Sequence, residues 1–519
     1  MAEPTPTDVL IAGAGPTGLV LALWLTAQGA RVRIIDSAPG PGTTTRAVAV
    51  QARTLELYRQ LDLAAAVLAA GHATIGVNLW ARGRRAARLP LGRIGEGLTP
   101  YPQLHIYSQD AHERLLTQRL AAAGVEVERG LRLAAIEQRA ASVLASVEGG
   151  SDASIEASFL VGCDGAHSVV RGAIGAQFAG GSYRHIFYVA DIEATGPVAD
   201  GELHVALETS DFLGVFPLDD GPRLRLVGTV RDERAARAES LEFADVSKIA
   251  LEGLPLEVKQ VNWFSTYRVH HRVADRFASG RVFLAGDAAH VHSPVGGQGM
   301  NTGIGDAINL AWKLAAVAAG RADQRLLDTY EPERIAFARQ LVATTDRAFS
   351  LVTADSALAG FIRTWLAPGI MAFAVRFRTI QRLAFRTVSQ TAIAYPRSAL
   401  SLGAAGAIAA GQRLPWTGAA GGADNFLPLP RPGWQGHVYG EVPVAVTAWF
   451  AANHLTLREF SWRRSLRRLG LTRGALYLLR PDDHVGLADP SPTPQALDAY
   501  FARIGVRPRE AAPGRSAPR

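Results

Sequence analysis

Residues 8–18 read Asp8-Val9-Leu10-Ile11-Ala12-Gly13-Ala14-Gly15-Pro16-Thr17-Gly18. The apolar run 8–12 predicts a buried strand, and the apolar residues 16–28 predict a helix after the glycine-rich turn. Residues 31–36 alternate between polar and apolar side chains and predict a second strand. A strand, a helix and a second strand in this order form the first unit of a doubly wound parallel sheet. The sequence therefore predicts an α/β fold with a Rossmann-like domain.

The glycine-rich turn fits a bound pyrophosphate. Gly13 permits a tight turn, Gly15 lets the backbone approach a phosphate, and Gly18 allows a helix to pack closely on a strand. The predicted helix points its free N–H groups and the positive end of its dipole to the same place. Asp36 closes the second strand, where a carboxylate accepts hydrogen bonds from an adenosine ribose. The pattern fits FAD and NAD equally, and we expect such a dinucleotide to contact Gly13, Gly15, Pro16, Thr17, Gly18 and Asp36.

The composition excludes several classes of protein. A chain of 519 residues, 48% hydrophobic and 19% charged, is expected to form two to four compact domains. The single cysteine, Cys163, excludes a disulfide framework or a cysteine metal cluster within one chain and favours a cytoplasmic location. Residues 1–8 lack the charged and apolar regions of a signal peptide. Arginines interrupt the apolar stretch 346–409, so no integral membrane protein is expected.

The net charge of +7 does not indicate a nucleic-acid-binding protein. Lysine occurs only at positions 248, 259 and 313, and the arginines are scattered. The densest basic run, at 82–88, contains no aromatic side chains on which bases stack. Such a charge attracts anionic substrates and cofactors instead. The histidine pairs 270/271 and 290/292 have no third ligand at a suitable spacing, so no metal site is predicted.

Two further motifs follow along the chain, and the later one has features that fit a flavin. With the glycine-rich turn at 13–18 as the first motif, the second motif is Leu160-Val161-Gly162-Cys163-Asp164-Gly165-Ala166-His167-Ser168-Val169-Val170-Arg171. The third motif is Phe283-Leu284-Ala285-Gly286-Asp287-Ala288-Ala289-His290, followed by Pro294 and by Gly296-Gly297-Gln298-Gly299-Met300-Asn301. A strand ending at Gly286 puts Asp287 at the carboxyl edge of the sheet, where its carboxylate can accept hydrogen bonds from ribityl hydroxyls. The glycines after it let the backbone lie against a flat ring, and N–H groups at the start of the next helix stabilise negative charge on that ring.

The three motifs, in this order, resemble those of FAD-dependent aromatic hydroxylases, the p-hydroxybenzoate hydroxylase-like and phenol hydroxylase-type single-component flavoprotein monooxygenases. Tyr330-Glu331-Pro332-Glu333-Arg334 matches a further stretch, and the resemblance covers residues 8–345. It implies non-covalent FAD, with NADPH or NADH as electron donor. It also implies FAD contacts by Arg46, Gln109, Asp164, Arg171, Gly286, Asp287, Pro294, Gly297, Gly299, Met300 and Asn301. For Asp164 and Arg171, an internal ion pair is the alternative interpretation.

The resemblance and the strand patterns together predict the domain organisation. The FAD-binding domain comprises residues 1–73, 99–182 and 270–345, and short alternating runs predict an inserted antiparallel sheet for the substrate at 74–98 and 183–269. A helical region follows at 346–410, and a tail at 507–519 is expected to be disordered. Residues 411–506 resemble the thioredoxin-like extension of phenol hydroxylase relatives through Leu478-Leu479-Arg480-Pro481-Asp482-Asp483-His484-Val485. Without a cysteine, this domain is expected to serve packing or a homodimer contact.

The resemblance implies a monooxygenase that hydroxylates a phenolic or other aromatic substrate, polycyclic ones included, through a C4a-hydroperoxyflavin. A Baeyer–Villiger or epoxidising enzyme would share every motif, and a non-enzymatic basic binding protein is the remaining alternative. No catalytic base is identified. The flavin-side wall of the reaction site is expected at Pro294, Val295, Gly296 and Gly297. The apolar candidates for the substrate face are Phe212, Phe216, Pro217, Trp263 and Tyr267.

Overall fold

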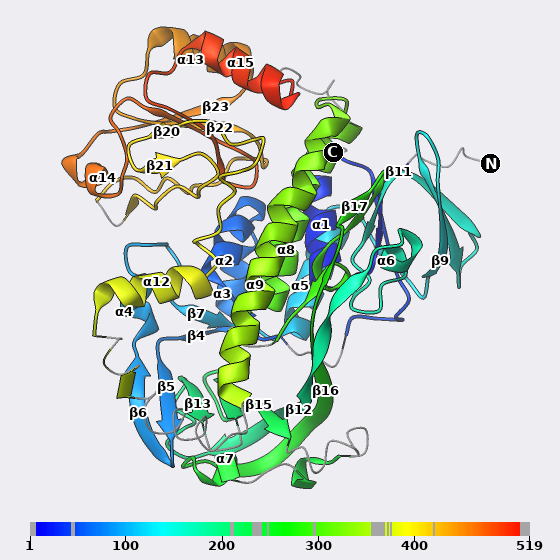
Figure 1. Ribbon diagram of the computed structural model, residues 1–519, viewed down its shortest axis with the longest axis vertical. Coiled ribbons are helices and arrows are strands. Elements are labelled where there is room, and N and C mark those ends of the chain that lie inside the picture. Colours follow the sequence, from blue (N-terminus) through cyan, green and yellow to red (C-terminus); the bar gives the residue numbers. More distant parts are fainter. Residues whose placement is uncertain are drawn as a thin grey trace.

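Figure 1 shows the computed structural model of the chain, which describes residues 7–42, 47–207, 212–230, 241–245, 249–293, 297–353, 369–370, 373, 376–418 and 421–508. Among these residues the first sheet has eight strands. Six of them lie in the order β17 (Ala278–Ser279), β18 (Val282–Leu284), β11 (Ser154–Gly162), β1 (Thr7–Ala12), β2 (Val32–Asp36) and β8 (Val127–Arg129). The other two, β10 (Val143–Glu148) and β9 (Arg132–Gln138), extend from β11 as an antiparallel arm.

The three motifs of the sequence meet at one edge of this sheet. β1 pairs in parallel with β2 and with β11, and β11 pairs in parallel with β18. The strands before the three motifs therefore end at the same carboxyl edge. Residues 9–11 of β1 are fully buried, as expected for a parallel strand covered on both faces.

Two helices that begin at this edge pack closely against each other. α1 (Pro16–Ala27) follows β1, and α8 (Gly299–Ala318) follows the third motif. A Cβ atom at Gly303 of α8 would lie 2.3 Å from Oγ1 of Thr17 in α1. This contact requires a glycine on α8, and it brings the N-terminal turns of both helices together. α5 (Gln109–Ala122) packs on α1 as well.

The second sheet has eight strands among the described residues. Their order is β19 (His290–Val291), β16 (Glu257–Ala274), β12 (Phe178–Thr195), β15 (Arg223–Val230), β14 (Phe212–Pro217), β13 (Leu203–Leu207), β5 (Val77–Ala81) and β6 (Arg84–Leu89). All neighbours are antiparallel, as predicted, except β13 and β5, which pair in parallel. That exception is possible because no hairpin joins these two strands, which lie far apart in the sequence. The long strands β12 and β16 cross the boundaries expected at residues 183 and 270.

The region expected to be helical from 346 to 410 is only partly so. α9 (Tyr330–Thr353) and α12 (Arg378–Val388) are helices, but residues 389–410 form turns and the two-residue strands β20 (Ala404–Ala405) and β21 (Ile408–Ala409). Pro396 cannot sit inside a helix, and Gly403 and Gly406 have positive φ angles of +81° and +67°. No helix among the described residues combines the length and the apolar character needed to cross a membrane.

The last part of the chain contains a four-stranded mixed sheet, drawn in orange and red in Figure 1. Its order is β23 (Thr456–Phe460), β22 (Gln435–Tyr439), β24 (Leu476–Leu479) and β25 (Val485–Asp489). α13 (Val444–Ala452) and α15 (Pro494–Ile504) share one apolar core with this sheet and with Trp312 of α8. The C-terminal part is therefore packed on the helix that starts at the third motif.

Candidate functional site

The turn between β1 and α1 needs glycine at two positions. Gly13 has a φ angle of +104°, and a Cβ atom there would lie 2.3 Å from the carbonyl oxygen of Cys163. A Cβ atom at Gly18 would lie 2.0 Å from the carbonyl oxygen of Gly13. Gly15 precedes Pro16, the first residue of α1, and a Cβ atom at Gly15 would meet nothing within 4 Å. Open space therefore lies beside the free N–H groups of this helix.

Asp36 braces the same turn from the end of β2. Its Oδ2 accepts a hydrogen bond from the backbone N–H of Ala14 at 2.6 Å, and its Oδ1 accepts one from Ala38 at 2.8 Å. Nη1 of Arg129 lies 3.7 Å from Oδ1. Because each carboxylate oxygen has more than one acceptor position, Asp36 can still accept a hydrogen bond from a ribose hydroxyl.

Gln109, the first residue of α5, binds the backbone of Ala47. Its Oε1 accepts from the N–H of Ala47 at 3.4 Å, and its Nε2 donates to Oε1 of Glu113 at 2.8 Å. The other oxygen of Glu113 accepts from the N–H of Gly42 at 3.1 Å. Arg46 itself lies outside the described residues. Glu113, whose pKa is raised by burial, was not predicted; its position one helical turn after Gln109 was the available signal.

Asp164 and Arg171 do not form the internal ion pair that was the alternative interpretation. The Asp164 carboxylate accepts from the N–H of Val169 at 2.7 Å, at the start of α6 (Val169–Ala173). The Arg171 guanidinium donates to the carbonyl oxygens of Ala288 at 2.9 Å and Ala166 at 2.8 Å. Burial lowers the pKa of Arg171, with Asp164 opposing the shift. Arg171 therefore ties the second motif to the third.

The turn after β18 presents Asp287, which is exposed. Gly286 has a φ angle of +65°, and a Cβ atom there would lie 2.6 Å from Oγ1 of Thr17, so Thr17 packs against this turn. The N–H of Gly286 donates to Oδ2 of Asp306 at 3.0 Å, and Nε2 of His290 lies 2.7 Å from the same oxygen. Asp306 is fully buried in α8. It was not predicted, although a carboxylate inside an apolar helix was a usable signal.

Part of the expected flavin-side wall lies outside the described residues, namely Pro294, Val295 and Gly296. Gly297 has a φ angle of +61°, and a Cβ atom there would lie 2.8 Å from Cβ of Ala49. Gly299 is the first residue of α8, and Met300 is partly buried against the core of the first sheet. Gly297 therefore lies close to β3 (Ala49–Val50).

The side chain of Asn301 is fully used inside the protein. Its Nδ2 donates to the carbonyl oxygens of Ala49 and Gly297, each at 2.9 Å. Its Oδ1 accepts from the N–H of Gln51 at 2.9 Å and from Oγ1 of Thr54 at 2.8 Å. Asn301 was expected to contact the cofactor, but its side chain fixes the loop, which leaves main-chain groups for a ligand.

Four of the five substrate-face candidates share one apolar cluster on the second sheet. They are Phe212, Phe216, Trp263 and Tyr267, packed around Phe187, Val189, Val227 and Val269. The fifth, Pro217, is buried at the end of β14 and does not belong to the cluster. β19 follows the turn that carries Asp287 and pairs with the end of β16, which carries Trp263 and Tyr267. The aromatic face is thus joined to the carboxyl edge of the first sheet.

A partly buried ion pair interrupts this aromatic face. Arg225 of β15 binds Asp191 of β12, with Nε–Oδ1 and Nη2–Oδ2 distances of 2.6 and 2.7 Å. Side chains alternate along a strand, so Arg225 lies on the same face as Val227. Its guanidinium is 5.9 Å from the ring centre of Trp263. Local sequence patterns do not reveal this pair, since its members lie 34 residues apart.

The histidines beside the site have partners within the protein. Nδ1 of His292 lies 2.7 Å from the carbonyl oxygen of Ser293, and Nδ1 of His270 lies 2.6 Å from Oγ of Ser182. In the part of the chain that the structure describes, no group of three or more His, Cys, Asp or Glu side chains could hold a metal ion.

Comparison with known proteins gives the same cofactor class. A family described as "FAD binding domain" matches residues 6–345. The chain is 39% identical to 6-methylpretetramide 4-monooxygenase of Streptomyces rimosus over 359 residues, which is 69% of this chain and 64% of that protein. It is 37% identical to a flavin-dependent monooxygenase of Mycobacteroides abscessus, over 64% of this chain and 72% of the relative. It is 32% identical to pentachlorophenol 4-monooxygenase of Sphingobium chlorophenolicum, over 66% of this chain and 64% of the relative.

Solved structures extend the similarity beyond the family match. OxyS anhydrotetracycline hydroxylase from Streptomyces rimosus has a TM-score of 0.76 and 28% identity, covering 98% of this chain and 100% of that chain. The flavin-dependent monooxygenase PieE, solved with FAD and substrate, has a TM-score of 0.76 and 21% identity, covering 97% of this chain and 100% of that chain. At this identity the similarity concerns the fold alone. The C-terminal part of the chain therefore belongs to the same overall architecture.

Proposed function

Because the chain belongs to the FAD binding domain family and, within it, to the FAD-dependent aromatic hydroxylases, we propose that it inserts one oxygen atom from O2 into a polycyclic phenol, with NADPH or NADH as electron donor. When bound, FAD supplies the redox chemistry with O2, while the protein supplies position, a dry site and electrostatics. One observation carries the proposal. The edge where the three motifs meet is joined through β19 to a sheet face lined with aromatic side chains.

The residues at the carboxyl edge fit FAD. The open space beside Gly15 and the N-terminus of α1 would receive the pyrophosphate. Asp36 would accept from the ribose, and the exposed carboxylate of Asp287 would accept from the ribityl chain. Main-chain N–H groups at the start of α8 would lie at the pyrimidine end of the flavin. Arg171 would support this arrangement indirectly, because it ties the second motif to the third, and Asp164 would do so by fixing the start of α6.

The substrate class is proposed from the aromatic face and from the relatives. Flat apolar rings pack well against side chains such as Phe212, Trp263 and Tyr267. The Arg225–Asp191 pair is a polar feature of that face and would orient a phenolic hydroxyl. Relatives named for 6-methylpretetramide and anhydrotetracycline support a substrate with several fused rings.

A substrate screen tests this function. Single-ring, three-ring and four-ring phenols are offered with NADPH or NADH, and the substrate-dependent oxidation of the nicotinamide is followed. We expect a fused-ring phenol to stimulate the rate most and to gain one oxygen atom from labelled O2. Product structures determined by NMR distinguish hydroxylation from epoxidation or ring expansion. If no phenol stimulated the rate of an FAD-loaded protein, the proposed function would be wrong.

Replacement of Gly297 by valine is expected to uncouple the reaction while the protein still folds. The added side chain meets Cβ of Ala49 and strains a backbone with positive φ, which displaces the flavin-side wall. The measured quantity is hydrogen peroxide released per product formed, which should rise. Gly320→Val is the matched control, because Gly320 at the other end of α8 has a φ of +69° and nothing within 4 Å of an added Cβ atom. Equal coupling in both variants would place residue 297 away from the reaction.

The remaining expectations are part of the same proposal. We propose that FAD is held without a covalent bond, so that acid denaturation releases it. The four strands with α13 and α15 support a thioredoxin-like C-terminal domain, without redox chemistry because it has no cysteine. We also propose a cytoplasmic homodimer, and light scattering tests the assembly.

A further inference from the structure

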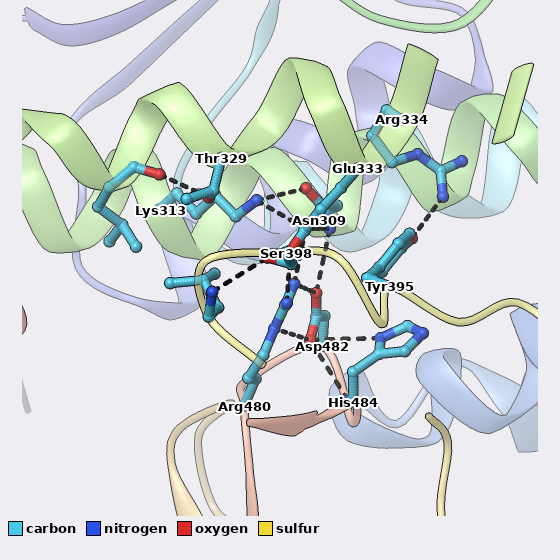
Figure 2. A network of polar contacts seen from close by, with 12 residues as sticks. Asn309, Lys313, Thr329, Glu333, Arg334, Tyr395, Ser398, Arg480, Asp482 and His484 are labelled. Carbon is cyan, nitrogen blue, oxygen red and sulfur yellow. Dashed lines mark hydrogen bonds and ion pairs between the residues drawn. The ribbon is translucent and has the colours of Figure 1, made fainter. Parts of the chain in front are cut away.

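A buried polar network joins α8 and α9 to the C-terminal part of the chain (Figure 2). We call it the interface network; its members are Asp306, Asn309, Lys313, Glu333, Arg334, Tyr395, Ser398, Arg480, Asp482 and His484. At its centre, Glu333 of α9 accepts from Arg480 at 2.6 and 2.9 Å and from Lys313 at 2.9 Å. Nε of Arg480 also donates to Oδ1 of Asp482 at 3.0 Å. The network thus pairs charges from three distant parts of the sequence.

The charges of this network balance within the interior. Glu333, Lys313 and Arg480 are each almost completely inaccessible to solvent. Burial by itself raises the pKa of Glu333, but Arg480 and Lys313 hold that pKa well below its usual range. Burial lowers the pKa of Lys313 to about 8, with Glu333 opposing the shift. A charge left without a partner here would destabilise the folded protein. Each charged member therefore has to stay beside its partner.

The network continues from Arg334 to the turn that carries Asp287. Arg334, next to Glu333 in α9, donates through Nη1 to the hydroxyl oxygen of Tyr395 at 2.7 Å and through Nε to Oδ1 of Asp306 at 2.6 Å. The other oxygen of Asp306 accepts from the N–H of Gly286 at 3.0 Å. Only Arg334 and Asp306 therefore separate the Tyr395 hydroxyl from this turn.

Tyr395 is in turn fixed by the C-terminal stretch. The guanidinium of Arg480 lies 5.5 Å from the centre of its ring. The ring of His484 lies 4.6 Å from it, centre to centre. Tyr395 itself is buried. The residues Arg480 and His484, which belong to the stretch that resembles the phenol hydroxylase extension, thus hold the side chain that accepts from Arg334.

We propose that Tyr395 is a positioning residue for FAD, through which the C-terminal part of the chain controls the geometry of the Gly286–Asp287 turn. Tyr395 orients Arg334, Arg334 orients Asp306, and Asp306 fixes the turn whose exposed carboxylate meets the ribityl chain. The C-terminal part then contributes to cofactor affinity without touching the cofactor. The inference rests on the proposed function, because it requires FAD at this turn.

The test compares two tyrosines that each lose only a buried hydroxyl. Tyr395→Phe removes the hydroxyl oxygen that accepts from Nη1 of Arg334. Tyr439→Phe, the matched control in β22, removes the acceptor of Nδ2 of Asn425, at 3.0 Å, and lies outside the interface network. Apoprotein is titrated with FAD while the flavin fluorescence is followed, and the thermal midpoint of each apoprotein is recorded. Tyr395→Phe is expected to raise the Kd for FAD roughly three- to tenfold, the scale of one hydrogen bond. The control is expected to keep the wild-type Kd.

A merely structural role would give a different result. In that case both variants would lower the thermal midpoint, and both would keep the wild-type Kd for FAD or weaken it equally; either outcome overturns the proposal. If Tyr395→Phe does not fold, Arg334→Lys is measured in its place. Lysine keeps the positive charge beside Asp306 but lacks the second nitrogen of the guanidinium that reaches the Tyr395 hydroxyl. A wild-type protein that fails to bind FAD would instead contradict the proposed function itself.

Discussion

Replacement of Arg480 by alanine is expected to lower the free energy of unfolding by about 3–5 kcal/mol. Arg480 is fully buried and donates to both oxygens of Glu333. Without it, Glu333 and Asp482 stay buried with too little positive charge beside them, because Lys313 is the nearest remaining cation of Glu333. Urea-induced unfolding measures the change. Tryptophan fluorescence reports on it, since the ring of Trp312 lies 5.4 Å from the Arg480 guanidinium.

Arg473→Ala provides the control for this measurement. Arg473 pairs with Glu441 at 3.2 Å, but the two side chains are 62% and 93% exposed. A pair of this kind contributes less than about 1 kcal/mol. If both variants lost the same stability, the buried network would contribute no more than a surface pair, and its proposed role in joining the two parts of the chain would fail.

Replacement of Asp287 by alanine is expected to weaken FAD binding about ten- to hundredfold in a protein that still folds. Asp287 is exposed at the carboxyl edge, so its loss leaves no cavity in the core. Hydrogen bonds to a charged group contribute about 1.5–3 kcal/mol, which corresponds to that range of Kd. Fluorescence titration of the apoprotein with FAD gives the value.

A second exposed carboxylate serves as the reference for Asp287. Asp152 precedes β11 and so lies near the amino end of that strand, whereas the second motif lies at its carboxyl end; Asp152 is 53% exposed and lies 3.2 Å from Arg33. Asp152→Ala is expected to leave the Kd for FAD unchanged. An Asp287→Ala protein with wild-type affinity would show that the ribityl chain lies elsewhere.

The elements around the first turn follow from local sequence. Gly13 and Gly18 stand between an apolar strand and an apolar helix, and the observed β1 and α1 begin and end within one residue of their expected bounds. Only local spacing and backbone freedom are needed for such a prediction. The common edge of the three motifs followed from the resemblance and the parallel pairing of their strands.

The residues and elements that the sequence did not predict depend on contacts between residues far apart in the chain. Nothing in the local sequence of α8 indicates a partner for Asp306 until Arg334, 28 positions later, is brought beside it. Arg53 and Asp482, whose bond spans 429 positions, show no local signal at all. Residues 389–410 contain eight alanines, which favour a helix, but Pro396, Gly403 and Gly406 oppose one, and the segment pairs with β25 instead. Contacts between distant residues therefore decide the roles of Asp306, Arg53 and Asp482.

The interface network also sets the order in which a growing chain can become complete. At ordinary rates of elongation, Lys313 and Glu333 are synthesised on the order of ten seconds before Arg480. Until then Glu333 of α9 has Lys313 of α8 as a partner but lacks Arg480. The interface network is therefore complete only after residue 484 has been synthesised. A chain that lacked residue 480 and the residues after it would therefore leave the buried carboxylate of Glu333 with Lys313 as its cation partner.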